Sequence, residues 1–123
     1  MTGVNWPAVI AGTVVAFLVG WAWYAPALFG RKWAEGSRVP MDADGFPVFA
    51  MGAQLVGLFV LALVVGITAT TDALITAILA IVGAAMLVVA NGAFCRKSGA
   101  ALGIDAGYVI VSGIVMIAAQ GLL

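Results

Sequence analysis

The stretch WAWYAPALFGRK, residues 21–32, marks the place where a long apolar segment of the chain ends. Aromatic residues gather first, Pro26 follows, and Arg31 and Lys32 then add two adjacent positive charges. Tryptophan and tyrosine are enriched where a helix passes the membrane–water interface, and lysine and arginine concentrate beyond it on the cytoplasmic side. Proline lacks a backbone N–H and disfavours helical geometry at the preceding residue, so the helix should end or kink at Pro26. The stretch is therefore interpreted as the exit of a membrane helix.

The composition places the whole chain in a membrane. The sequence has 123 residues, of which 65% are hydrophobic and 8% charged, and its mean hydropathy is +1.23. A soluble domain of this size needs more polar side chains to cover its surface. The net charge is zero and no basic tract is present, so nucleic acid is not an expected partner. The expected partner is the lipid bilayer.

Metal, cofactor and disulfide chemistry are not expected. The chain has no histidine, and Cys95 is its single cysteine, so neither a disulfide nor a thiolate cluster can form within it. Asp42-Ala43-Asp44-Gly45 resembles part of a calcium loop but lacks the further ligands and the closing glutamate, and it is interpreted as a turn before a helix.

Charged residues divide the chain into four apolar segments, and the prediction is a single all-α domain over residues 1–123. The first segment, 6–27, is about 33 Å long as a helix and can cross a hydrocarbon core of about 30 Å. Asn5 is placed to cap it, and Asp105 to cap the last. The N-terminal residues lack the basic group that opens a signal peptide, so the first helix should be retained. The expected helices are 6–27, 48–70, 73–94 and 105–123, with loops at 28–47 and 95–104. They should form an integral membrane four-helix bundle of two antiparallel hairpins.

The basic residues predict the orientation in the membrane. All of them fall in the two loops that share one side of a four-span chain: Arg31, Lys32, Arg38, Arg96 and Lys97. The positive-inside rule makes that side cytoplasmic and puts the N- and C-termini outside, in the periplasm of a bacterium. We expect a multi-pass protein of the bacterial inner membrane. Because the charge bias is one-sided, any homo-oligomer should be parallel.

Small residues recur at every fourth position of the first helix: Ala8, Gly12, Ala16 and Gly20. Such a stripe lets the backbone of another helix approach closely. Tyr24 occupies the next position of the stripe. The stripe is interpreted as a packing face, in preference to a ligand groove.

Polar residues gather at the depth of the predicted cytoplasmic half. The candidate polar pocket consists of Tyr24, Gln54, Asn91, Asp105, Tyr108 and Ser112, and its basic rim of Arg31, Lys32, Arg96 and Lys97. Polar groups inside a membrane need partners, so these side chains could hydrogen-bond across helices around a cavity. The alternative is structural, with the tyrosines belonging to the interface belt and Asp105 serving only as a helix cap.

Three segments resemble a known family. Asn5-Trp6, WYAPALFGRKW at residues 23–33 and IDAGYVIVSGIVM at residues 104–116 are similar to the hallmark segments of DUF1761, a bacterial family of small four-span membrane proteins. The resemblance covers the whole chain and implies the four-helix fold, and it carries no activity. In the family the first motif usually reads Trp-Tyr-Ser-Pro and the residue after the last tyrosine is often histidine, so Ala25 and Val109 depart from the pattern.

Three classes of function are compatible with these features. The favoured class is a membrane protein without catalytic machinery, either a homo-oligomer or an accessory subunit of a larger membrane complex. The alternative is a small oligomeric channel or transporter with a cytoplasm-facing polar pocket. An enzyme is not expected, because Asp105 is the lone carboxylate near the pocket and has no catalytic partner.

Overall fold

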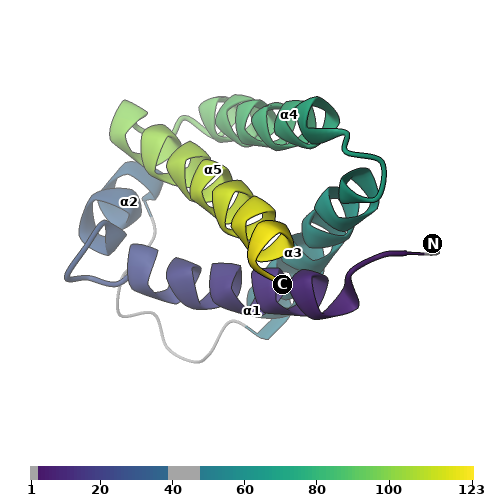
Figure 1. The fold of residues 1–123 in the computed structure, drawn as a ribbon. Coiled ribbons are helices and arrows are strands. Elements are labelled where there is room, and N and C mark those ends of the chain that lie inside the picture. The colour runs from purple at the N-terminus through teal and green to yellow at the C-terminus, as the bar shows by residue number, and fades with distance from the viewer. Residues whose placement is uncertain (1–2, 39–47) are drawn as a thin grey trace.

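The computed structural model describes residues 3–38 and 48–123, and within these ranges the chain is helical (Figure 1). The helices are α1 (Trp6–Trp23), α2 (Gly30–Ser37), α3 (Val48–Ala69), α4 (Leu74–Phe94) and α5 (Gly99–Leu122). Four of them, α1, α3, α4 and α5, are long and apolar enough to cross a membrane. The all-α prediction is confirmed.

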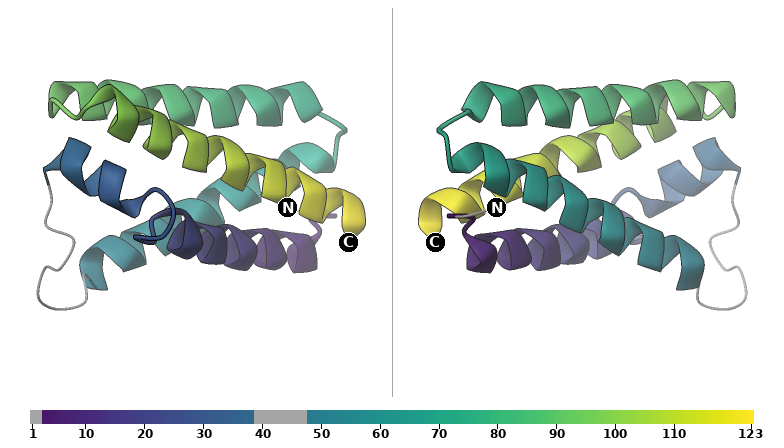
Figure 2. Two further views of the ribbon diagram at one scale, coloured as in Figure 1. Left: turned by 90° about the vertical axis from the view of Figure 1, so that its left-hand side faces the viewer. Right: turned by 90° about the vertical axis from the view of Figure 1, so that its right-hand side faces the viewer.

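The long helices form a crossed bundle (Figure 2). Helices α1 and α4 lie on opposite sides, and α3 and α5 run diagonally between them in different directions. Both termini lie at the end of the bundle that carries the turn between α3 and α4, and α2 lies at the other end beside the connection from α4 to α5. Helices α3 and α4 are close together at their turn and diverge toward the α2 end.

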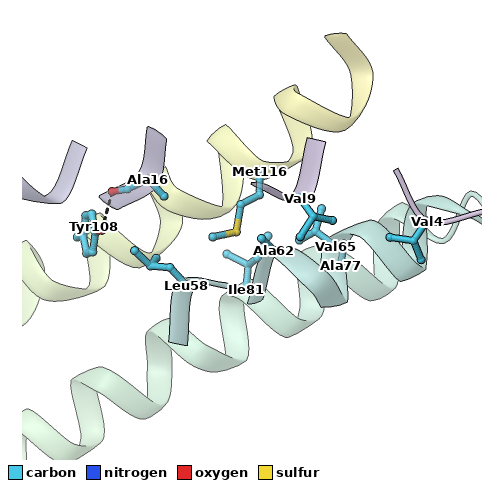
Figure 3. Close-up of a cluster of buried hydrophobic side chains, with 10 residues drawn as sticks. All are labelled: Val4, Val9, Ala16, Leu58, Ala62, Val65, Ala77, Ile81, Tyr108 and Met116. Atoms are coloured by element: carbon cyan, nitrogen blue, oxygen red, sulfur yellow. Dashed lines mark hydrogen bonds between the residues drawn. The ribbon is translucent and has the colours of Figure 1, made fainter. Parts of the chain in front are cut away.

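A small core holds the bundle together (Figure 3). Val9 of α1 and Met116 of α5 are almost completely buried, and Ile81 of α4 lies beside them. Outside this core, large apolar side chains such as Val56 and Leu87 stay exposed. Helices that are apolar on all sides but packed on only one suit a lipid environment.

Helix α1 is shorter than predicted, ending at Trp23 and not at residue 27. The proline explains the early stop, since its ring excludes the preceding residue from helical geometry. The released carbonyls are satisfied by the backbone, because Ala22 accepts from the amide of Ala25 at 3.2 Å and Trp23 from that of Phe29 at 3.2 Å. Pro26 therefore ends the helix and redirects the chain into α2.

The predicted loop at 28–47 contains the eight-residue helix α2. This helix is amphipathic and too short for the pattern of a membrane span to reveal it. The rest of that loop, with Asp42 and Asp44, lies outside the described residues.

Helix α5 begins at Gly99, six residues before the predicted start at Asp105, so the loop predicted at 95–104 is much shorter. Ser98 caps the helix, its hydroxyl accepting from the amide of Ala101 at 3.1 Å. The predicted capping role of Asp105 is wrong, because this residue lies inside α5. Asn5 does cap α1, accepting from the amide of Ala8 at 3.2 Å. Helix α3 ends one residue earlier than predicted, at Ala69, and α4 begins one residue later than predicted, at Leu74.

Candidate functional site

A cavity of about 780 Å³ lies in the half of the bundle that carries α2. Its walls come from α1, the turn after it, α2, the separated parts of α3 and α4, the α4–α5 connection, and α5. The lining residues are Phe17, Gly20, Trp21, Tyr24, Ala25, Pro26, Trp33, Ala50, Met51, Gln54, Val88, Lys97, Asp105, Tyr108 and Val109. Helices α3 and α4 diverge at this end of the bundle (Figure 2, right), and residues of both helices line the cavity.

A buried carboxylate organises the polar part of the cavity. The hydroxyl of Tyr24 donates to Oδ1 of Asp105 at 2.6 Å. The ammonium of Lys97 donates to Oδ2 of the same carboxylate at 2.9 Å. Lys97 and Asp105 form the one ion pair among the residues that the structure describes. The side chain of Lys97 is 24% exposed and that of Asp105 is 12% exposed. Both carboxylate oxygens therefore already accept from a donor.

Aromatic side chains hold in place the triad formed by Tyr24, Asp105 and Lys97. The ring of Tyr24 meets Trp33 and Tyr108 edge-on, with centroids 5.3 and 5.6 Å apart. The ammonium of Lys97 lies 5.5 Å from the ring centroid of Trp33, within reach of a cation–π interaction. The uncharged aromatic rings thus hold in place Tyr24 and Lys97, the two side chains that donate to Asp105.

Helix α5 is tied to α1 by two further side-chain donors. The hydroxyl of Tyr108 donates to the carbonyl of Ala16 at 2.7 Å, as Figure 3 shows. The indole N–H of Trp23 donates to the carbonyl of Ile104 at 2.9 Å. Both bonds join the second half of α1 to the first half of α5, where the cavity lies.

The stripe of small residues on α1 faces α5. Ala8 and Ala16 are buried. A Cβ atom on Gly12 would lie 3.3 Å from the Cα of Met116, and one on Gly20 would lie 2.5 Å from the hydroxyl oxygen of Tyr108. The close approach of the two helices thus depends on small side chains, and it brings Tyr24, the next residue of the stripe, to Asp105.

Helix α2 covers the same end of the cavity. The amide of Ser98 donates to the carbonyl of Gly36 at 3.0 Å, and the guanidinium of Arg38 donates to the carbonyl of Arg96. A Cβ atom on Gly36 would collide with the side chain of Ser98. This contact places Trp33 against Lys97.

The structure brings together part of the predicted polar pocket. Tyr24, Gln54, Asp105 and Tyr108 line the cavity. Asn91 does not line it and is exposed on α4. Ser112 is completely buried one turn further along α5, and its hydroxyl is without a partner among the described residues.

The predicted basic rim divides in a similar way. Lys97 lies in the cavity wall and forms the ion pair. Arg31, Lys32 and Arg96 are exposed at the same end of the bundle, outside the cavity lining. The sequence interpretation places Lys97 on the rim and Asp105 in the pocket, but no local pattern indicates that these two side chains form an ion pair.

Trp33 is the main lining residue that the sequence interpretation does not include in the pocket. The sequence predicts an interfacial loop at this position, whereas α2 folds back and turns the ring of Trp33 toward Tyr24. The available signal is its position within WYAPALFGRKW, ten residues after Trp23. Ala25 and Val109, where the chain departs from the family pattern, also line the cavity.

Asp105 is the one acid among the described residues that line the cavity, and each of its carboxylate oxygens accepts one hydrogen bond. Within residues 3–38 and 48–123, no group of three acidic, histidine or cysteine side chains could hold a metal ion.

Comparison with known proteins confirms the resemblance seen in the sequence motifs. The family described as "Protein of unknown function (DUF1761)" matches residues 7–121. No curated protein and no solved structure matches the chain.

Proposed function

The chain belongs to the DUF1761 family of unknown function, and we propose that it is a non-catalytic, multi-pass protein of the bacterial cytoplasmic membrane. Helices α1, α3, α4 and α5 would cross the bilayer, with both termini outside. The observation that carries the proposal is the distribution of charge. The basic residues lie on α2 and beside it, at the end of the bundle opposite the termini.

The exposed surface supports the membrane location. On α3 and α4, side chains such as Phe59, Leu79 and Leu87 are exposed although they are large and apolar. In water, leaving them exposed would forgo about 1.5–3 kcal/mol for each side chain that could be buried. In a bilayer the same side chains contact lipid and carry no such penalty.

The proposal includes assembly, either as a parallel homo-oligomer or as part of a larger membrane complex. A Cβ atom added at Gly52 or Gly57 of α3 would have no described residue within 4 Å, so the surface of α3 is open to close approach by another helix at each of these positions. A parallel arrangement follows from the one-sided charge. Oligomeric state in mild detergent tests the homo-oligomer, and a strictly monomeric protein contradicts it. Copurification with other membrane proteins tests the larger complex, and purification without any of them contradicts that alternative.

The absence of catalysis is proposed from the state of Asp105. This carboxylate accepts from Tyr24 and Lys97 and thereby holds the turn after α1 and the α4–α5 connection against α5, which is a structural role. The described lining of the cavity provides no second acid, and the chain has no histidine to act as a partner.

The second candidate function is transport through an oligomer, which the polar cavity favours. In one chain the cavity does not continue through the bundle, because the core around Val9, Ile81 and Met116 fills the other half. Translocation would therefore require movement of the helices or a pathway between chains.

Cys95 provides a direct test of orientation. It is exposed at the end of α4 and is the single cysteine of the chain. A membrane-impermeant maleimide should label it in inside-out vesicles and leave it unlabelled in intact spheroplasts. The matched control is Cys95→Ser combined with Thr71→Cys, which moves the thiol to the turn between α3 and α4 and should reverse the pattern. Labelling of Cys95 in spheroplasts would refute the proposed orientation.

A further inference from the structure

The cavity combines one ionic group with a lining that is mostly apolar. The ionic group is the Lys97–Asp105 pair, at the same end of the bundle as the exposed basic residues. Met51 of α3 and Val88 of α4 both line the cavity, and these two helices diverge at this end of the bundle. We propose that the cavity binds one anionic phospholipid of the surrounding membrane, with its phosphate at Lys97 and an acyl chain leaving between α3 and α4. This inference assigns a ligand to the protein, and it rests on the proposed membrane location and orientation but not on assembly.

The sign of the charge follows from the hydrogen bonds. Asp105 already pairs with the ammonium of Lys97, so a cationic ligand would have to compete with Lys97 for this carboxylate. Lys97 has three donors and uses one of them on Asp105. Its side chain is 24% exposed, so the remaining donors can reach a phosphate in the cavity.

The surroundings reinforce this preference for an anion. Arg31, Lys32 and Arg96 are exposed at the same end and form no ion pair with any residue in the described ranges. Basic pockets between helices near the cytoplasmic surface are suited to anionic lipid headgroups. Among the described residues of this end, the basic side chains outnumber the acidic ones, Glu35 and Asp105, and would attract such a headgroup.

The apolar lining fits an acyl chain. Phe17, Trp21, Pro26, Met51 and Val88 supply most of the wall away from Lys97. The volume of about 780 Å³ is within the usual range of ligand sites. A headgroup and part of one chain can be accommodated, and the rest of the lipid would remain in the bilayer.

Gln54 supplies a polar group within the apolar α3. Its side chain is exposed, lines the cavity, and makes no hydrogen bond to any residue that the structure describes. An unpaired amide at membrane depth is costly. The glycerol and ester oxygens of a phospholipid would provide acceptors for it below the phosphate.

Native mass spectrometry of the full chain in mild detergent provides the test. The probes are phosphatidylglycerol, phosphatidylcholine with the same acyl chains, and glycerol phosphate alone. Both lipids offer a phosphate to Lys97, but the quaternary ammonium of phosphatidylcholine would lie beside Lys97 and the exposed basic residues and be repelled by them. One molecule of phosphatidylglycerol should therefore be retained about tenfold more tightly than phosphatidylcholine. Equal retention of the two lipids would overturn the proposal, and so would binding of glycerol phosphate as tight as that of phosphatidylglycerol.

Two charge variants test the sign. Asp105→Asn removes the competing carboxylate, so phosphatidylglycerol retention should be maintained or increased. The double variant Lys97→Gln with Asp105→Asn removes the cation without leaving an unpaired charge, and it should abolish the preference over phosphatidylcholine. Loss of binding in Asp105→Asn, or an unchanged preference in the double variant, would refute the proposed site.

Two steric variants test the location. Ala50→Trp at the exposed mouth and Val88→Trp in the wall should each reduce lipid retention about tenfold or more. The matched control is Val82→Trp, an exposed position of α4 outside the lining, which should leave retention unchanged. Because Ala50 is exposed, its replacement tests the site even if Val88→Trp impairs folding. Retention by Ala50→Trp equal to that of the control would contradict the proposal.

Discussion

The hydroxyl of Tyr24 donates a 2.6 Å hydrogen bond to the carboxylate of Asp105, 81 positions later in the chain. This bond joins the turn after α1 to the second turn of α5, where Lys97 completes the triad. It therefore holds the turn that contains Pro26 against the wall of the cavity. The stability of the bundle and the geometry of the cavity thus depend on the same pair.

Replacing Tyr24 by phenylalanine removes the hydroxyl and leaves Oδ1 of Asp105 without this donor. We expect the free energy of unfolding to fall by about 1–3 kcal/mol, the usual effect of removing one partner from a buried polar pair. Denaturation by sodium dodecyl sulfate in mixed micelles measures this change. The control Thr70→Val removes an exposed hydroxyl and should have little effect. If Tyr24→Phe is equally destabilising when Asp105 is already leucine, the hydrogen bond is not the cause.

Replacing Gly20 by alanine places a Cβ atom 2.5 Å from the Tyr108 hydroxyl oxygen. The ring of Tyr108 must move, so the bond to Ala16 weakens, and we expect a loss of about 1–3 kcal/mol from overpacking. The matched control Gly57→Ala, with open space around the added Cβ, should be neutral or stabilising by up to about 1 kcal/mol through helix propensity. The same unfolding assay compares the two, and equal effects would argue against close packing of α1 on α5.

Replacing Ser112 by alanine should not destabilise the protein, although the residue is completely buried. Its hydroxyl has no hydrogen-bond partner among the described residues, so its removal relieves an unfavourable desolvation of about 1 kcal/mol. The expected free energy of unfolding is unchanged or higher. A loss above about 1 kcal/mol would indicate a hydrogen bond that Ser112 makes in the membrane.

Replacing Gly36 by alanine should detach α2 without unfolding the bundle. The added methyl group would meet Ser98 and Ala101 at the contact that places α2 on α5. Hydrogen exchange of residues 30–38 should accelerate, while the core of α5 stays protected, because the opening is local. The control Gly99→Ala, at the start of α5 with open space around its Cβ, should leave exchange in α2 unchanged. Unchanged protection in Gly36→Ala would show that this contact does not hold α2.

The family resemblance and the helical character were predictable because they depend on local features. The apolar runs, the cap at Asn5 and the stop at Pro26 each act within a few residues of chain. The stripe from Ala8 to Gly20 also predicted a packing face. Its four-residue period follows from helix geometry alone.

The candidate site was only partly predictable, since it depends on how the helices cross. Gln54 and Asn91 have similar polarity and similar predicted depth, yet Gln54 lines the cavity and Asn91 is exposed outside it. The two residues differ because α3 presents Gln54 to the cavity, whereas α4 presents Asn91 to the outside of the bundle. Trp33 shows the same limit, because its ring reaches Tyr24 only after α2 has folded back.

By itself, the sequence determined the four apolar helices and the gathering of positive charge at one end, because hydropathy and charge act residue by residue along the chain. The tertiary structure decided the start of α5, the docking of α2 and the divergence of α3 from α4. It also decided that Asp105, which the sequence suggested as a helix cap, is the acceptor shared by Tyr24 and Lys97. That outcome required contacts between residues far apart in sequence, which no local pattern records.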